Sequence, residues 1–127
     1  MYSVAVNRDF VAQHFLFGGD WGKENRPHSH SFRVEIRLEG EQLDRHGYLT
    51  DIVDIEKNLD QQVNYFQDQL LNDLPEFSGL NPSVEHFSRI ICERFLQNLQ
   101  NRGLAAVTVK LWENREAWAA FRMEIKG

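Results

Sequence analysis

Two histidines one residue apart, His28 and His30, stand at the start of a segment in which apolar and polar side chains alternate. Successive side chains of a β-strand point to opposite faces, so both imidazoles would project from the same face, roughly 7 Å apart along the backbone. At that separation they can bind one ligand together. Two imidazoles held side by side on a buried face are costly to desolvate without a cation, which favours a metal site.

A third histidine, His14, lies on the mostly apolar face of an earlier segment that has the same two-residue period. If the two strands pair as neighbours, His14 lies opposite the start of the second strand and completes a set of three. Three neutral imidazoles leave one position on a zinc ion for water or substrate, which is typical of catalytic zinc. Taken alone, His14 is better interpreted as a hydrogen-bonded core histidine. It is the pair of His28 and His30 that favours a metal site.

A carboxylate also occupies a position where the pattern requires an apolar side chain. Glu113 continues the inward face of Val107, Val109 and Leu111, and burying an unpaired carboxylate is unfavourable. Glu113 can lie beyond the edge of the core in water, or it can accept two N–H donors of a heterocyclic ligand. The second interpretation predicts a pocket beside the histidines.

The elements that position these residues follow from hydrophobic periodicity, with a period of two for strands and of three to four for helices. Strands are predicted at both ends and two helices between them, over residues 4–16, 28–39, 54–70, 82–99, 107–113 and 118–125. Asn81 is predicted to cap the second helix, with Pro82 in its first turn and Gly103 at its end. The order β-β-α-α-β-β predicts an α+β domain, with an antiparallel sheet and two helices packed on one side.

The overall composition excludes several classes of protein. The 127 residues suit one domain, 1–127, and the 42% of hydrophobic residues suit a folded core. The net charge of -5 argues against nucleic acid and anionic membranes as partners. Neither a run of about 20 apolar residues nor a signal segment occurs, which predicts a cytoplasmic protein. Cys92 is the only cysteine, so a metal site must use His, Asp or Glu.

Several short motifs occur in an order and spacing that are together specific. They are "FVAQHF", the His-x-His at the start of a strand, "GYLTDIVDIEKNL", "LLND", "NPSVEHF" and "LWEN". On these motifs the chain resembles the 6-pyruvoyl-tetrahydropterin synthase and 6-carboxytetrahydropterin synthase family over nearly its whole length. The resemblance implies a tunnelling fold, in which sheets of three subunits close into a barrel. Two such trimers stack into a homohexamer, with the sites between subunits.

The resemblance also implies roles for the residues above. His14, His28 and His30 correspond to the family's Zn2+ ligands, and Glu113 to the glutamate that anchors the pterin. The implied substrate is 7,8-dihydroneopterin triphosphate. A base removes a side-chain proton and triphosphate leaves, with side-chain cleavage in the carboxy-forming branch of queuosine biosynthesis. The chain is therefore expected to be a lyase of the 6-carboxytetrahydropterin synthase type.

The usual acid-base residues of this family are replaced. "WGKENRPHSH" holds no cysteine before the His-x-His, and Glu24 stands four residues before His28 instead. Gln67 and Asp68 occupy the place of the family's Asp-His pair, so Asp68 and His86 are candidates for proton transfer beside Glu24. A variant of this family with glutamate at the cysteine position cleaves the side chain to give 6-hydroxymethyldihydropterin.

Three other interpretations stay open. One is that cleavage to 6-hydroxymethyldihydropterin, with Glu24 as the base. Another is a non-catalytic protein that binds metal and pterin, in which Glu24 is a solvated loop acid. The third is a structural oligomer whose histidines are packed core residues.

Overall fold

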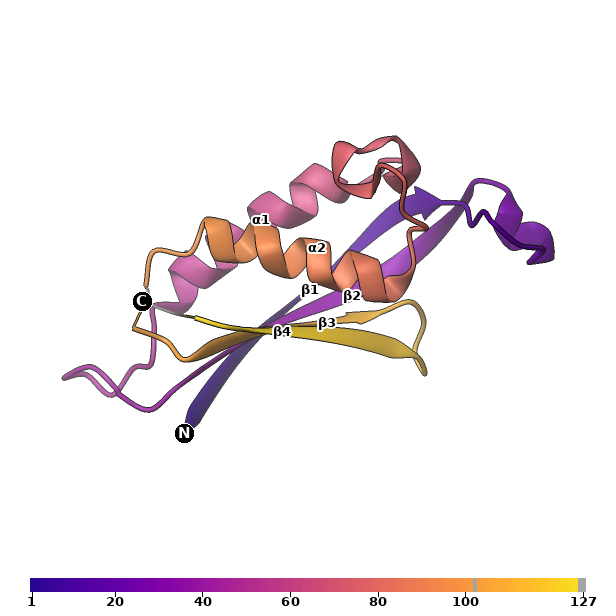
Figure 1. Ribbon diagram of the computed structural model, residues 1–127. Helices are drawn as coiled ribbons and strands as arrows, with labels where there is room; N and C mark the ends of the chain where they lie inside the picture. Colours follow the sequence, from indigo (N-terminus) through magenta and orange to yellow (C-terminus); the bar gives the residue numbers. More distant parts are fainter. Residues whose placement is uncertain (102, 126–127) are drawn as a thin grey trace.

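The computed structural model describes residues 1–101 and 103–125 and shows the predicted α+β architecture. Four antiparallel strands form one sheet in the order β1 (Tyr2–His14), β2 (His28–Gly40), β3 (Ala106–Trp112) and β4 (Trp118–Glu124). Two helices, α1 (Ile52–Phe66) and α2 (Val84–Gln97), lie on the same face of that sheet (Figure 1). This order of strands and helices confirms the predicted tunnelling-fold topology. Neither helix of the described residues is long and apolar enough to cross a membrane.

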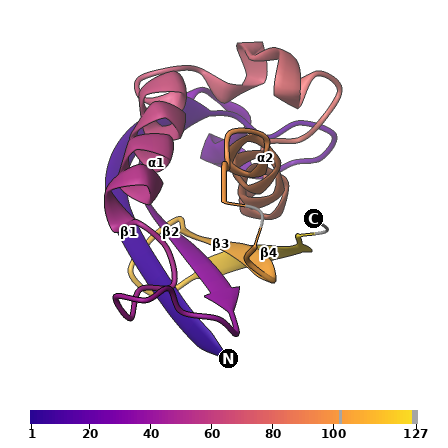
Figure 2. The same cartoon turned by 90° about the vertical axis from the view of Figure 1, so that its left-hand side faces the viewer.

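The core lies between the sheet and the two helices, where the sheet curves around them (Figure 2). Along β2 the inward side chains are fully buried, whereas Arg33 and Arg37 on the opposite face are exposed. The inward residues of β2 are Phe32, Val34, Ile36 and Leu38. Each buried side chain of this size contributes about 1.5–3 kcal/mol relative to an exposed one. This burial fixes which face of β2 points inward, and with it the face that carries the two histidines.

The two long strands bring His14 and His28 together. β1 and β2 pair over their whole length, from Tyr2 opposite Gly40 to His14 opposite His28. The predicted pairing of the first two strands is therefore confirmed. The first strand was expected to reach Leu16 but ends at His14, because the backbone N–H groups of Phe15 and Phe17 donate to side chains of Asn72 and Asn81.

The first helix is shifted toward the N-terminus relative to the predicted range 54–70. It begins after Asp51, whose side chain accepts a hydrogen bond from the N–H of Val53. It ends at Phe66, because Asp68 has a left-handed backbone with φ of 61°. Leu70 therefore lies outside the helix and forms a bridge with Gln13 of β1.

The second helix is shorter than predicted, and three of its predicted end signals were wrong. Ser83, not Asn81, is the N-cap, so Pro82 lies before the helix rather than in its first turn. The helix ends at Gln97 with Asn98 as the C-cap, well before Gly103.

Strand β3 ends at Trp112, one residue before Glu113.

We expect Ser83→Ala to lower the free energy of unfolding by about 1 kcal/mol, because its hydroxyl accepts the N–H of His86 at 3.1 Å. Urea unfolding with excess chelator measures this effect without a contribution from bound metal. Ser78→Ala is the matched control, since Ser78 is exposed and caps no α-helix. Equal losses in the two variants would contradict the assignment of Ser83 as the cap.

Candidate metal centre

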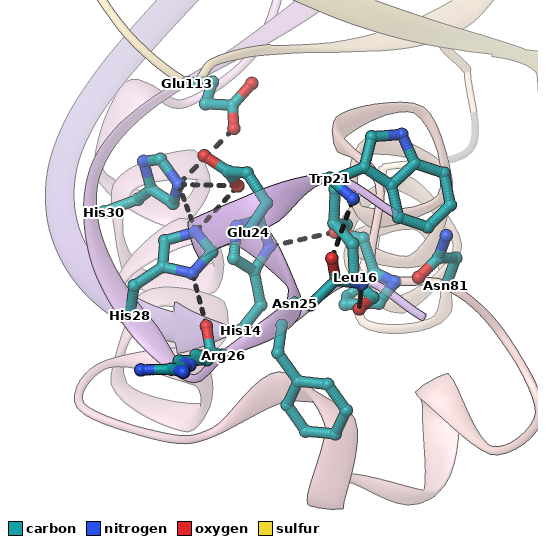
Figure 3. Close-up of polar contacts among 12 residues, drawn as sticks. His14, Leu16, Trp21, Glu24, Asn25, Arg26, His28, His30, Asn81 and Glu113 are labelled. Carbon is teal, nitrogen blue, oxygen red and sulfur yellow. Dashed lines mark hydrogen bonds and ion pairs between the residues drawn. The ribbon is translucent and has the colours of Figure 1, made fainter. Parts of the chain in front are cut away.

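The three histidine rings meet where β1 ends and β2 begins (Figure 3). Their ring centroids are 4.7 Å apart for His14 and His28, 4.7 Å for His14 and His30, and 4.6 Å for His28 and His30. Phe32 lies beneath them, with its ring centroid 5.7 Å from that of His30. The structure therefore brings the three predicted metal ligands together on an apolar floor.

His14 presents one unsatisfied nitrogen to this group. Its side chain is buried, and Nδ1 donates to the carbonyl oxygen of Pro82 at 3.0 Å. Burial lowers the pKa of His14 to about 4, so the ring is neutral and Nε2 carries a lone pair. This buried Nε2 has no hydrogen-bond partner within the described residues. An orphaned buried acceptor of this kind fits a bound cation.

A backbone carbonyl also sets the orientation of His28. Its Nδ1 lies 2.7 Å from the carbonyl oxygen of Arg26, which can only accept, so Nδ1 carries the hydrogen. The other nitrogen, Nε2, lies 2.8 Å from Nε2 of His30. Metal-binding histidines commonly donate their second N–H to a carbonyl or a carboxylate in this way. His28 and His30 thus direct their Nε2 atoms toward the same point.

Glu24 completes a group of four potential ligands. Its Oε2 lies 2.9 Å from Nε2 of His28 and 4.0 Å from Nε2 of His30. The ligand atoms of these three residues and His14 all lie within 4.8 Å of one another. Three nitrogens and one carboxylate oxygen suit Zn2+. The donor set therefore fits the metal that the resemblance implied.

A short 3-10 helix over Gly22–Asn25 carries Glu24 beyond the end of the sheet. The carbonyl oxygen of Glu24 accepts the N–H of Leu16 at 2.7 Å. The side chain of Asn25 donates to the carbonyls of Leu16 and Gly19 and accepts the N–H of Trp21. These bonds hold the loop against the end of β1, so they fix the backbone of Glu24 beside the histidines.

Glu113 lies on the far side of His30, just after β3. Its Oε1 is 3.5 Å from Nε2 of His30, and its side chain is 31% exposed. It lines an open hollow beside Ser31, Trp112 and Arg115. The structure therefore places the predicted pterin anchor next to the histidines with its carboxylate accessible.

Sequence reasoning missed residues that position the site. Asn72 accepts the N–H of Phe15 and donates to its carbonyl oxygen, both at 3.0 Å. Asn81 accepts the N–H of Phe17, and the carbonyl of Pro82 orients His14. These three residues lie in the motifs "LLND" and "NPSVEHF", which were the only signal for them.

Two other predicted catalytic residues lie outside the four-residue group. Asp68 is exposed, and its N–H donates to the carbonyl of Val11. His86 is partly buried in the first turn of α2. Their roles in proton transfer stay predictions.

The single cysteine is part of the core. Cys92 is fully buried in α2, and its sulfur faces the carbonyl oxygen of Val107 at 3.9 Å. Burial raises the pKa of this thiol to about 12, so it is protonated at neutral pH and a poor nucleophile.

We expect Cys92→Ala to retain the metal content and turnover of the wild type, while the free energy of unfolding falls by about 1 kcal/mol. Metal analysis and urea unfolding check the two parts. Thiol labelling gives an independent readout, since the native thiol should react far more slowly than the unfolded one. Loss of turnover with full metal content would assign the thiol a catalytic role.

Comparisons with known proteins agree with the predicted family. The model of the family described as 6-pyruvoyl tetrahydropterin synthase matches residues 3–124. An Archaeoglobus fulgidus protein provisionally named 6-carboxy-5,6,7,8-tetrahydropterin synthase is 29% identical over 119 residues, 94% of each chain. The Bacillus subtilis 6-carboxy-5,6,7,8-tetrahydropterin synthase is 27% identical over 130 residues, which cover 95% of this chain and 86% of that one.

The fold matches solved structures as well. The Plasmodium vivax 6-pyruvoyl tetrahydropterin synthase superposes with a TM-score of 0.83 at 15% identity, over 98% of both chains. A variant of that enzyme in which a catalytic glutamate is replaced by alanine gives a TM-score of 0.82, also at 15% identity and over 98% of both chains. Because the family model matches nearly the whole chain, this protein belongs to the 6-pyruvoyl tetrahydropterin synthase family.

Proposed function

We propose that this protein is a zinc-dependent lyase of the 6-carboxytetrahydropterin synthase type that acts on 7,8-dihydroneopterin triphosphate. The observation that carries the proposal is the convergence of His14, His28, His30 and Glu24 beside the accessible carboxylate of Glu113. Zn2+ bound there would polarise the hydroxyl groups of the substrate side chain and make the adjacent C–H more acidic.

Each residue has a distinct part in this proposal. Glu113 accepts the 2-amino and ring N–H donors of the pterin and so orients the side chain toward the histidines. Glu24 is the proton acceptor, because its carboxylate already lies beside the rings of His28 and His30. Asp68 and His86 are candidates for relaying the proton. In the single chain both lie outside the site, and neighbouring subunits could bring them nearer.

Assembly is part of the proposal. β1 and β4 are the outer strands of the four-stranded sheet, and each has one edge without a strand partner among the described residues. Unpaired sheet edges favour pairing with a further strand. We therefore propose that the single domain, 1–127, forms a homohexamer from two trimers, through closure of the sheet into a barrel.

A second candidate reaction is cleavage of the side chain to 6-hydroxymethyldihydropterin. The observation that favours it is the position of Glu24, a carboxylate where the family's usual base is a thiol. The Plasmodium vivax enzyme also has a catalytic glutamate. A carboxylate and a thiolate differ in basicity, so the fate of the shared substrate can differ.

Product identification after incubation with 7,8-dihydroneopterin triphosphate tests the proposal. Chromatography with mass analysis separates 6-carboxytetrahydropterin, which supports the first reaction, from 6-hydroxymethyldihydropterin, which supports the second. Protein from which a chelator has removed the metal is the control, and it should form neither product. Pterin binding without any new product or released triphosphate would leave a non-catalytic binding protein and refute both reactions.

A further inference from the structure

We infer that Glu24 is a fourth protein ligand of the metal in the resting protein and is displaced when substrate binds. This inference rests on the proposed metal site and goes beyond the role of Glu24 as a base. It predicts that the site is closed at rest by three imidazoles and one carboxylate.

The distances between ligand atoms carry the first step. Zinc binds nitrogen and oxygen at about 2.0–2.2 Å, so two ligand atoms of one ion are roughly 3 to 3.5 Å apart. The Nε2 atoms of His28 and His30 are 2.8 Å apart, and Oε2 of Glu24 lies 2.9 and 4.0 Å from them. These separations bracket the spacing that a common ion requires, with the carboxylate included.

The hydrogen-bond roles carry the second step. Because Nδ1 of His28 donates to the carbonyl of Arg26, the ring directs only Nε2 at the carboxylate of Glu24, which lies 2.9 Å away. Nε2 and Oε2 can lie this close only with a positive charge between them, either a proton or a metal ion. The orphaned Nε2 of His14 lies in the same group and adds a lone pair that no donor of the described residues satisfies. A divalent cation satisfies all these acceptors at once.

The loop structure distinguishes Glu24 from Glu113. The backbone of Glu24 is braced against Leu16 by a 2.7 Å hydrogen bond, and Oε2 approaches two of the rings (Figure 3). Glu113 approaches only His30, at 3.5 Å, and is not a member of the four-atom group. Glu24 is thus the carboxylate built into the ligand set, whereas Glu113 remains available for a ligand in the hollow.

A closed site has a consequence for catalysis. Four protein ligands are typical of structural zinc, whereas catalytic zinc keeps one position open. Substrate must therefore displace Glu24 to reach the ion. The released carboxylate then lies beside the substrate side chain as a free acceptor. Glu24 can therefore close the metal site in the resting protein and act as the base in the substrate complex.

Zinc affinity in the absence of substrate tests this inference. We expect Glu24→Gln and Glu24→Ala each to bind Zn2+ at least about tenfold more weakly than the wild type in competition with a chromophoric chelator. The visible spectrum of the Co2+-loaded protein should change in both variants, since it reports the number and type of ligands. Glu85→Gln removes the same charge from an exposed residue that lines a hollow together with Glu113, and it should keep wild-type affinity within about twofold.

The outcomes separate this inference from the proposed function. Wild-type zinc affinity and an unchanged cobalt spectrum in both Glu24 variants would overturn the fourth ligand and leave the three histidines intact. Failure of the wild type to bind zinc, or equal binding by His28→Ala, would overturn the metal site itself. Circular dichroism of each variant confirms that it is folded. Adding 7,8-dihydroneopterin should change the cobalt spectrum of the wild type, and no change would overturn the displacement of Glu24.

Discussion

The His28→Ala variant is expected to lose stoichiometric zinc binding and to fall to background turnover. The substitution removes one of three imidazoles that converge on one point. The nitrogens of His14 and His30 cannot take the place of the lost ligand atom. Mutation of a residue that only hydrogen-bonds to a metal ligand weakens metal binding about 10–100-fold. Loss of the ligand itself should therefore weaken zinc binding more than about 100-fold. Metal analysis of the purified variant, together with a competition titration, measures the effect.

The same substitution should also abolish the stabilisation that metal gives to the folded state. A ligand at about 1,000 times its Kd stabilises the native protein by about 4 kcal/mol, so chelation should lower the melting temperature of the wild type and leave that of His28→Ala unchanged. His46→Ala is the matched control, because His46 is exposed in the loop before α1. Equal stability of the wild type with and without chelator would favour histidines that are merely packed in the core.

Much of this site was predictable because strand periodicity is a strong constraint. Alternation fixed the shared face of His28 and His30, and pairing of consecutive strands placed His14 opposite them. A one-residue change of register would have moved all the inward residues of β2 to the exposed face. The apolar pattern thus specified the arrangement of the three imidazoles as firmly as it specified the core.

Other features depend on tertiary hydrogen bonds that leave no periodic signal. Asn81 has the chemistry of an N-cap, yet its side chain accepts the N–H of Phe17, so Ser83 takes the capping role. The approach of Glu24 to the rings depends on the bonds that join its aperiodic loop to Leu16. Local propensity cannot predict such partners, because they come from distant parts of the chain or from irregular backbone.

The Glu24→Gln variant, saturated with zinc, is expected to lose about 10²–10⁴-fold in kcat. Glutamine keeps the size of the side chain and one acceptor oxygen but cannot accept the substrate proton at neutral pH. KM should stay the same or fall, because Glu113 supplies the main contact to the pterin and the substrate no longer has to displace a carboxylate from the ion. Steady-state kinetics at zinc concentrations that fill the variant site, checked by metal analysis, separate lost catalysis from lost metal.

Glu24→Asp distinguishes a base from a structural carboxylate. It retains the basic group but shortens the side chain by one methylene, so turnover should fall less than in Glu24→Gln. A Glu24→Gln enzyme with wild-type kcat would move the proton transfer to another group. Asp68→Asn and His86→Gln would then test the two remaining candidates for proton transfer. If only Glu24→Gln loses turnover, the carboxylate at the three rings takes the proton, whichever pterin product is released.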